Sequence, residues 1–167
     1  MAGTRWLAAA ALAGAAMTAS AAAEMKSAVT AEEIEAMLDA AGLNPTMSED
    51  AATRAPVAYG RAGEVTFFVR ALDCGGRPAA CETLMFFANF GLGREVGAED
   101  ARILNRFNER QVFGRAYFIE GRGEVGVDYV IELGGGVTSE HLAKNVGRWS
   151  DVIAAFLDNF RSERGAS

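Results

Sequence analysis

Two strongly β-forming segments on either side of a short loop constrain this chain more than any other feature. Residues 64–72 and 83–90 are rich in β-branched and aromatic side chains, which favour strands. The six residues between Cys74 and Cys81 are glycine, arginine, proline and alanine, a turn-forming composition. The pattern predicts an antiparallel hairpin with one cysteine on each side of its loop, where a cross-strand disulfide is geometrically reasonable.

The spacing of the two cysteines bears on how the thiols are used. A redox or metal pair is the alternative to a structural disulfide, but six intervening residues match neither C-x-x-C nor the common zinc-ligand spacings. A disulfide between Cys74 and Cys81 is therefore favoured if the chain works in an oxidising compartment. A ring of this size constrains the unfolded chain by roughly 2–3 kcal/mol.

The first 23 residues indicate such a compartment. A positive charge at Arg5, an alanine-rich apolar run over residues 6–17 and small residues at 21–23 follow the order of a secretory signal peptide. We expect cleavage at about Ala23 and export to the periplasm or, alternatively, out of the cell. The run is shorter than the roughly 20 apolar residues of a spanning helix, so a retained anchor is the weaker alternative. No cysteine follows the run to carry a lipid.

The net charge argues against two classes of partner. The chain has a net charge of −6, and removal of residues 1–23 takes away one arginine and no acid, which leaves about −7. Proteins that bind nucleic acid draw much of their affinity from neutralised phosphates, and docking on anionic lipid also needs basic residues. We therefore expect neither nucleic acid nor an anionic membrane surface as the partner.

The remaining segments alternate between helices and strands. Thr30 and Glu33 have the spacing of a capping box that opens a helix, and Gly42 ends that helix. The other predicted elements are a polar loop at 44–54, a weak strand at 56–59, a helix at 98–110, strands at 114–120 and 124–133, and a last helix that begins at Thr138 or Ser139. The order α-β-β-β-α-β-β-α predicts an α+β domain, an antiparallel sheet with helices packed on it.

We expect a single domain over residues 31–161. A short linker at 24–30 precedes it, and a flexible tail at 162–167 follows it. The chain shows no internal repeat and no sign of a second domain.

The two central strands carry apolar side chains on both faces. Phe67 and Val69 point to one face, whereas Phe68 and Leu72 point to the other. A sheet with one solvated face would instead alternate apolar and polar side chains. Either a second element, such as the first helix, covers the opposite face, or that face is a partner surface or an apolar pocket. The candidate recognition surface consists of Phe68, Arg70, Met85 and Phe87.

Several short motifs follow one another in a set order along the chain. They are Cys74 and Cys81 between two strands, Asn105-Arg106-Phe107-Asn108, Phe113-Gly114-Arg115-Ala116-Tyr117, Gly135-Gly136-Val137, and Trp149 and Phe156 in the last helix. In this combination the chain resembles the YbjN family, bacterial proteins described as sensory transduction regulators. Phe107 departs from the tryptophan expected in close relatives but keeps an aromatic anchor. The resemblance implies a fold like that of type III secretion chaperones, suggests a homodimer and brings no catalytic residues.

Other motifs that can signal chemistry have structural interpretations in this chain. Residues 121–126 have the pattern G-x-G-x-x-G, but a dinucleotide site needs it between a strand and a helix, and here it joins two predicted strands. His141 is the only histidine, so a zinc site or catalytic triad would have to be built around it alone. Asp128 and Glu132 lie about 13 Å apart on one strand face, too far for a carboxylate pair, and we expect them in solvent. No catalytic, cofactor or metal site is predicted.

A group of polar residues forms the second candidate site. Asn105 and Asn108 lie near the end of the second predicted helix, just before Arg110, Arg115 and Tyr117. A buried asparagine must satisfy both its donors and its acceptors. These amides therefore either tie the helix end to the backbone of the adjoining strand or form a small recognition site. In the second case Arg110 or Arg115 would meet an anionic group.

These patterns leave two functions open. The favoured one is a non-enzymatic exported module that binds another protein through the candidate recognition surface, as a chaperone-like adaptor or sensory regulator. The alternative is a small-molecule sensory domain with an apolar cavity under the final helix and Asn105, Asn108 or Arg115 at its mouth. An enzyme is disfavoured because neither a nucleophile–base pair nor a metal cluster is visible in the sequence.

Overall fold

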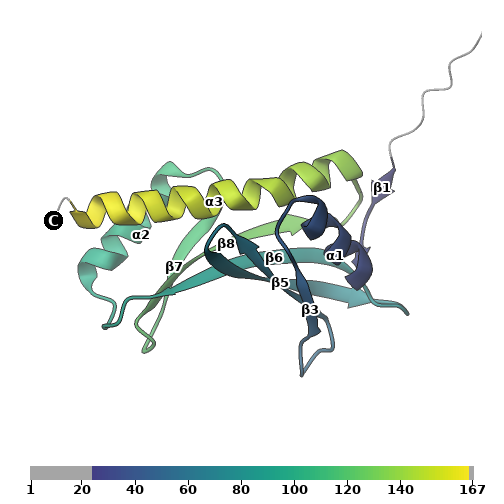
Figure 1. Cartoon of the computed structure of the whole chain (residues 1–167), viewed down its shortest axis with the longest axis horizontal. Helices are drawn as coiled ribbons and strands as arrows, with labels where there is room; N and C mark the ends of the chain where they lie inside the picture. The colour runs from purple at the N-terminus through teal and green to yellow at the C-terminus, as the bar shows by residue number, and fades with distance from the viewer. Residues whose placement is uncertain (1–23, 166–167) are drawn as a thin grey trace, which may run out of the picture.

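The computed structural model describes residues 24–165. Within them, helices α1 (Ala31–Ala40), α2 (Ala98–Arg110) and α3 (Ser139–Gly165) lie on one side of a large antiparallel sheet (Figure 1). The strands of this sheet are β2 (Val29–Thr30), β3 (Thr46–Glu49), β4 (Pro56–Ala62), β5 (Val65–Gly75), β6 (Ala80–Gly91), β7 (Arg115–Ile119) and β8 (Glu124–Glu132). The short strands β1 (Met25–Lys26) and β9 (Val137–Thr138) pair with each other. The predicted α+β class is confirmed.

Strand β6 is at the centre of the sheet. In the order β3-β4-β5-β6-β8-β7 it pairs with β5 on one side and with β8 on the other. Phe68 of β5 lies opposite Phe87 of β6, and Phe87 lies opposite Asp128 of β8. Asp128 in turn lies opposite Arg115 on the edge strand β7. Because directly opposite residues point to the same face, these side chains form one row across the sheet.

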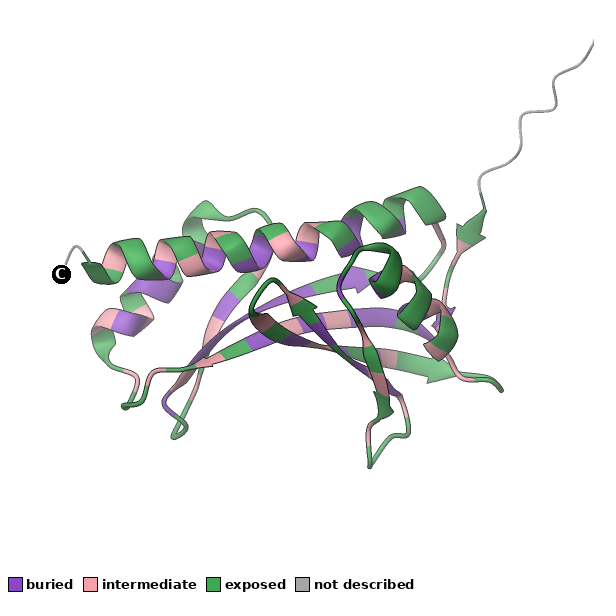
Figure 2. Cartoon of the chain, viewed as in Figure 1, coloured by how far each residue is buried: buried purple, intermediate pink, exposed green. Residues whose placement is uncertain are grey.

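The core lies between the sheet and α3. Trp149 of α3 is fully buried, and its ring centroid lies 5.7 Å from that of Phe67 and 5.8 Å from that of Phe86. Further along α3, Phe156 packs against Phe107 of α2 with their ring centroids 5.6 Å apart. Figure 2 shows buried segments on the strands that run beneath α3. Phe107, expected as an aromatic anchor, is thus buried in this core together with Trp149 and Phe156 of the last helix.

The sequence-based prediction misses one edge strand. The loop predicted at 44–54 contains β3, which pairs with β4. The residues of β3 are mostly exposed, so the alternation that marks a half-buried strand is absent. The loop prediction is wrong because backbone pairing with β4, rather than side-chain burial, forms this strand. β4 also extends beyond the predicted strand at 56–59, to Ala62.

The residues predicted as a linker, 24–30, belong to the fold. They contain β1, which pairs with β9, and β2, which pairs with β6. Val29 of β2 is fully buried opposite Cys81. The linker prediction is wrong because partners that are distant in the sequence hold these short strands. The signal peptide predicted at 1–23 lies outside the described residues.

The last helix continues into the predicted tail. We expected residues 162–167 to be flexible, but α3 is helical to Gly165, and residues 166–167 lie outside the described part of the chain. Glu163 forms ion pairs with Arg106 at 2.9 Å and with Arg110 at 3.0 Å. These pairs join the end of α3 to α2.

Cys74 and Cys81 form a disulfide bond between β5 and β6. Both strands continue into the loop predicted between them, so the two cysteines lie directly opposite each other with their Cα atoms 3.9 Å apart. Cys74 is exposed, whereas Cys81 is fully buried. The bond lies at the loop end of the central hairpin, with one cysteine on each side of the loop, as the sequence predicts.

Two local predictions at turns are confirmed. The Thr30 N–H donates to Glu33 Oε2 at 2.9 Å and the Glu33 N–H donates to Thr30 Oγ1 at 3.3 Å, which is the capping box of α1. The G-x-G-x-x-G pattern at 121–126 spans the β7–β8 hairpin and precedes no helix. Gly123 has a φ of +62°, and a side chain there would lie 2.4 Å from the carbonyl oxygen of Arg94, so this turn requires glycine.

Candidate functional site

Within the described residues, one face of the large sheet has no helix over it (Figure 1). The first helix is a candidate cover for this face, but α1 buries Ile34 and Leu38 in the same core as α3. The expectation that α1 covers the second face is therefore wrong, because both helices pack on the same side. The apolar side chains of the opposite face therefore remain a candidate partner surface or pocket.

Three aromatic side chains lie next to one another across this uncovered face. The ring centroids of Tyr59 on β4 and Phe68 on β5 are 5.0 Å apart, and those of Phe68 and Phe87 on β6 are 5.2 Å apart. Phe68 and Phe87 are half-buried, and Tyr59 is exposed. We call these three residues the aromatic row. They lie on paired strands of the sheet, so their spacing is set by the rigid backbone beneath them.

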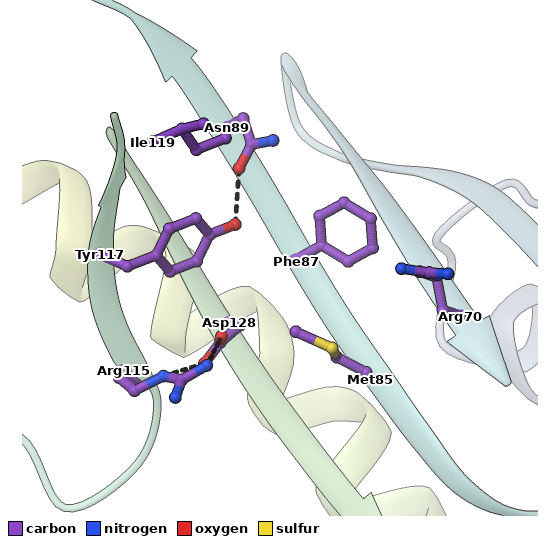
Figure 3. Close-up of a pocket in the computed structure, with 8 residues that line it drawn as sticks. All are labelled: Arg70, Met85, Phe87, Asn89, Arg115, Tyr117, Ile119 and Asp128. Carbon is purple, nitrogen blue, oxygen red and sulfur yellow. Dashed lines mark hydrogen bonds and ion pairs between the residues drawn. The ribbon is translucent and has the colours of Figure 1, made fainter. Parts of the chain in front are cut away.

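Beside the aromatic row is an open pocket with a volume of about 280 Å³, which we call the sheet-face pocket. Figure 3 shows its lining side chains, which come from β5, β6, β7 and β8. They are Arg70, Met85, Phe87, Asn89, Arg115, Tyr117, Ile119 and Asp128. The pocket thus joins Arg70, Met85 and Phe87 of the candidate recognition surface with Arg115 and Tyr117 of the candidate polar site.

A buried carboxylate anchors one of the pocket's arginines. Asp128 Oδ1 accepts a hydrogen bond from Arg115 Nε at 3.3 Å, and Asp128 Oδ2 accepts one from Arg115 Nη2 at 2.5 Å. Asp128 is only 4% exposed, so the expectation that it lies in solvent is wrong. The error arises because Arg115, the first residue of the edge strand β7, lies opposite Asp128 and over it. The carboxylate raises the pKa of Arg115, which stays charged.

On another side of the pocket, the side chain of Tyr117 reaches across a neighbouring strand. The hydroxyl of Tyr117 on β7 donates to Asn89 Oδ1 on β6 at 2.6 Å, across the intervening strand β8. The residue of β8 between them is Gly126, and a side chain there would lie 2.7 Å from Tyr117 Cζ and 2.6 Å from Asn89 Oδ1. Only glycine lets this bond form.

The phenol of Tyr117 stays protonated under physiological conditions. Burial and then the nearby charge of Asp128 raise its pKa to about 12. The hydroxyl is therefore a permanent donor to Asn89 Oδ1, which fixes the orientation of the amide. Asn89 Nδ2 is left as a donor that points away from Tyr117 (Figure 3).

The second candidate group does not form a single site. Asn108 Nδ2 donates to the carbonyl oxygen of Ala116 at 3.0 Å, and the Ala116 N–H donates to Asn108 Oδ1 at 2.7 Å. This is the structural interpretation, in which the amide ties α2 to the adjoining strand. Arg110 lies at the end of α2, paired with Glu163. Asn105 lines a separate depression between α2 and β7.

The space expected to hold a cavity under the final helix is filled. Trp149 lies among the rings of Phe67 and Phe86, and Phe156 stacks on Phe90 with centroids 5.4 Å apart. Large aromatic side chains thus occupy the space beneath the middle of α3. A pocket of about 290 Å³ lies instead between α1 and the start of α3, with none of Asn105, Asn108 or Arg115 in its lining. The depression that contains Arg115 lies on the opposite face of the sheet.

The single histidine lies away from the sheet-face pocket. His141 is exposed in the first turn of α3, where its N–H donates to Thr138 Oγ1 at 3.1 Å. Among residues 24–165, no three histidine, cysteine, aspartate or glutamate side chains are grouped as a metal site would require. Over the same residues, none of the helices has the length and hydrophobicity to span a bilayer.

Sequence reasoning missed three residues of the pocket region. Asn89 and Ile119 line the pocket, and Gly126 makes room for the bond across β8. A glycine in the interior of an otherwise apolar strand signals a close approach, and Gly126 carries that signal. Nothing in the sequence pattern pairs it with Asn89 or Tyr117.

The structure defines a class of α+β domain in which helices cover one face of an antiparallel sheet and an aromatic row lies on the other. A family model described as "YbjN: Putative bacterial sensory transduction regulator" matches residues 30–162 of this chain. The chain therefore belongs to the YbjN family, as its motifs indicated.

A solved structure supports the fold. The crystal structure of YbjN from E. coli, titled a "putative transcription regulator", superposes with a TM-score of 0.53 and 17% sequence identity. The match covers 77% of this chain and 89% of that chain. A comparison with curated proteins found no match to this chain. At this identity the likeness establishes the shared fold, and the function has to be argued from the site.

Proposed function

We propose that this protein is a non-enzymatic protein-binding module of the cell envelope, a sensory regulator or chaperone-like adaptor that binds its partner through the uncovered sheet face. The observation that carries the proposal is the aromatic row, which lies half-buried or exposed on strands with no helix over them. Exposed apolar groups that adjoin polar side chains are typical of protein interaction sites.

The composition of the face supports binding. Aromatic residues, methionine and arginine are enriched at protein interfaces, and Phe87, Met85 and Arg70 all line the sheet-face pocket. A central pocket that accepts a side chain of the partner is the usual location of the residues that dominate affinity.

The chemistry of the pocket supports binding rather than acid–base catalysis. Arg115 is paired with Asp128 and has a raised pKa, and Tyr117 has a pKa of about 12. Neither group exchanges its proton near neutral pH, which general acid–base catalysis requires.

Export rests on the sequence of residues 1–23, which has the order of a signal peptide. The disulfide between Cys74 and Cys81 is consistent with this, because such bonds persist in oxidising compartments.

The test is cross-linking of the full-length protein in its native cells, followed by mass spectrometry. We compare wild type with Phe68→Asp, Phe87→Asp and a control, Val112→Asp, which changes a residue that is 86% exposed in the loop after α2. Thermal melting of each purified variant shows whether it is folded. The proposal expects a reproducible partner that both phenylalanine variants lose and the control retains. Unfolded phenylalanine variants would assign these residues to stability alone. Partners that survive in folded variants would overturn the proposal.

A second candidate function is small-molecule sensing at the same pocket. The observation that favours it is a volume of about 280 Å³, close to the lower end of ligand sites, with apolar and polar lining together. Native mass spectrometry of the protein purified without denaturation tests it. A bound small molecule that Phe87→Asp releases would support sensing, and a mass equal to the bare chain would count against it.

A further inference from the structure

The sheet-face pocket presents two guanidinium groups, each with a carboxylate partner, on an acidic protein. The whole chain has a net charge of −6, yet Arg70 and Arg115 lie on opposite sides of Phe87 and Met85 (Figure 3). The one carboxylate that lines the pocket, Asp128, is 4% exposed beneath Arg115. A partner that reaches the pocket therefore meets guanidinium groups before it meets a carboxylate.

The guanidinium group of Arg70 is only weakly paired with a carboxylate. Its Nη2 lies 3.4 Å from Asp50 Oδ2, and its side chain is 47% exposed. Asp50 Oδ1 is committed to its own loop, since it accepts from the N–H groups of Ala52 at 3.0 Å and Thr53 at 2.9 Å. The long contact leaves most donors of Arg70 available for a stronger acceptor.

Arg115 supplies hydrogen-bond donors with a fixed orientation. Its Nε and Nη2 are held by Asp128, which fixes the plane of the guanidinium, while 70% of the side chain stays exposed. A guanidinium has five N–H donors, so the remaining ones face outward in a defined orientation. An arginine that is already ordered loses less conformational freedom when it binds a carboxylate.

Between the arginines the floor is apolar and adaptable. Met85 and Phe87 are half-buried, and methionine adjusts its shape to fit an incoming side chain. Asn89 Nδ2 adds a further donor at the rim. Donors on the rim and apolar groups on the floor complement an apolar side chain with a carboxylate beside it.

We propose that the partner presents a peptide segment in which an acidic residue lies next to a large apolar one. The apolar side chain packs on Met85 and Phe87, and the carboxylate binds Arg70 and the outward donors of Arg115. This proposal rests on the proposed function, because it names the chemistry of the partner at the same face. A basic segment would bring like charges together at Arg70 and is rejected.

The test uses a random linear peptide display library, selected on the purified chain with its disulfide intact. Parallel selection on Phe87→Asp identifies the peptides that need the pocket. Peptides specific to wild type are expected to contain aspartate or glutamate next to leucine, isoleucine, phenylalanine or tryptophan. The strongest of them is then synthesised, and its dissociation constant is measured at low and at high salt.

Two matched charge-reversal variants test the role of Arg70. Arg70→Glu is expected to weaken the synthetic peptide at least about tenfold, with the loss shrinking as salt rises. Arg161→Glu, an equal charge change at an exposed position of α3 on the other side of the sheet, is expected to leave binding unchanged. Thermal melting confirms that both variants are folded.

The outcomes separate the two proposals. Basic or uncharged peptides among the wild-type-specific set, or indifference to Arg70→Glu, would overturn the acidic partner while leaving the face as a binding surface. Peptides that bind Phe87→Asp as well as wild type would overturn both. Self-association that competes with every peptide, seen as a dimer by size-exclusion chromatography, would replace the acidic segment by a second copy of the chain.

Discussion

Arg115 covers the carboxylate of Asp128, so that one of the few buried acids of the fold is neutralised by an arginine whose other side faces solvent. Arg115→Met keeps much of the side-chain stem but leaves Asp128 buried without its partner. We expect a loss of about 2 kcal/mol in the free energy of unfolding, less than for a fully buried pair because Arg115 is exposed.

Urea denaturation followed by circular dichroism measures this loss. The double variant Arg115→Met/Asp128→Asn is expected to regain part of the stability, since the uncompensated charge is then absent. An Arg115→Met protein as stable as wild type would show that solvent, rather than arginine, neutralises Asp128.

Gly126 is predicted to be intolerant of even a methyl group. Gly126→Ala would press against Tyr117 and Asn89, displacing the tyrosine and breaking its hydrogen bond, at a cost of about 1–3 kcal/mol. Gly147→Ala is the matched control, because a side chain at that position of α3 meets nothing within 4 Å. It is expected to be neutral or to stabilise the helix by up to about 1 kcal/mol. Thermal melting of both variants is the measurement, and equal effects would refute the packing argument.

Asp100 gives the fold a defined dependence on acid. Its carboxylate accepts from Arg94 Nη1 at 2.7 Å and from the Gly97 N–H at 2.9 Å at the start of α2, and chiefly the bond from Arg94 holds its pKa below the usual 3.8. Because the folded-state pKa is lower than the unfolded one, the contribution to stability is complete above the usual pKa. It is lost as pH falls through the folded-state pKa.

We therefore expect the free energy of unfolding of wild type to exceed that of Asp100→Asn by about 1 kcal/mol at neutral pH. The gap is expected to shrink as pH falls below the usual pKa of 3.8. Urea denaturation at each pH measures the gap. Arg94→Met should remove most of the same acid dependence, since it removes the main cause of the lowered pKa. A gap that does not shrink as pH falls below 3.8 would contradict this account.

The disulfide is expected to contribute stability by constraining the unfolded hairpin. Its cysteines are seven residues apart, and loss of the bond in Cys74→Ser/Cys81→Ala should cost about 2–3 kcal/mol. Alanine is chosen at position 81 because Cys81 is buried and a hydroxyl there would lack water. The comparison is urea denaturation of wild type with and without reductant beside the double variant. If reductant changes nothing in wild type, the bond carries no stability.

Export predicts a defined N-terminus for the mature protein. Cleavage at about Ala23 would make Glu24 the first residue, which intact-mass analysis of the protein from the periplasmic fraction would detect. Replacing the apolar run at 6–17 by a sequence containing charges should keep the chain in the cytoplasm with free thiols. Recovery of the uncut chain in the membrane fraction would indicate a retained anchor instead.

The parts of the fold that bury apolar side chains could be predicted from the sequence, and the parts held by backbone pairing could not. The central hairpin and the last helix show clear periodicity because Phe67, Phe86 and Trp149 meet in one core. Strand β3 shows none, because an edge strand with exposed side chains is stabilised by hydrogen bonds to β4. The same holds for β2, whose partner Cys81 is distant in the sequence.

The candidate site also has one part that the sequence predicts and one part that it does not. Alternation along single strands was enough to place Phe68, Met85 and Phe87 on one face. Joining them to Arg115 and Tyr117 requires the order β6-β8-β7 and its register, which no local pattern encodes. Asp128 was assigned to solvent because the residue that lies over it comes from another strand.

The amide of Asn108 occupies both backbone groups with which Ala116 could receive another strand. An unprotected sheet edge is where chains add to one another in fibres and domain swaps, and a side chain that imitates a strand closes that route. Growth of the sheet past β7 is thereby blocked at Ala116, near the start of the strand. A second copy is thus kept from adding as a strand at the β7 edge, and the proposed recognition falls to the aromatic row on the uncovered face of the sheet.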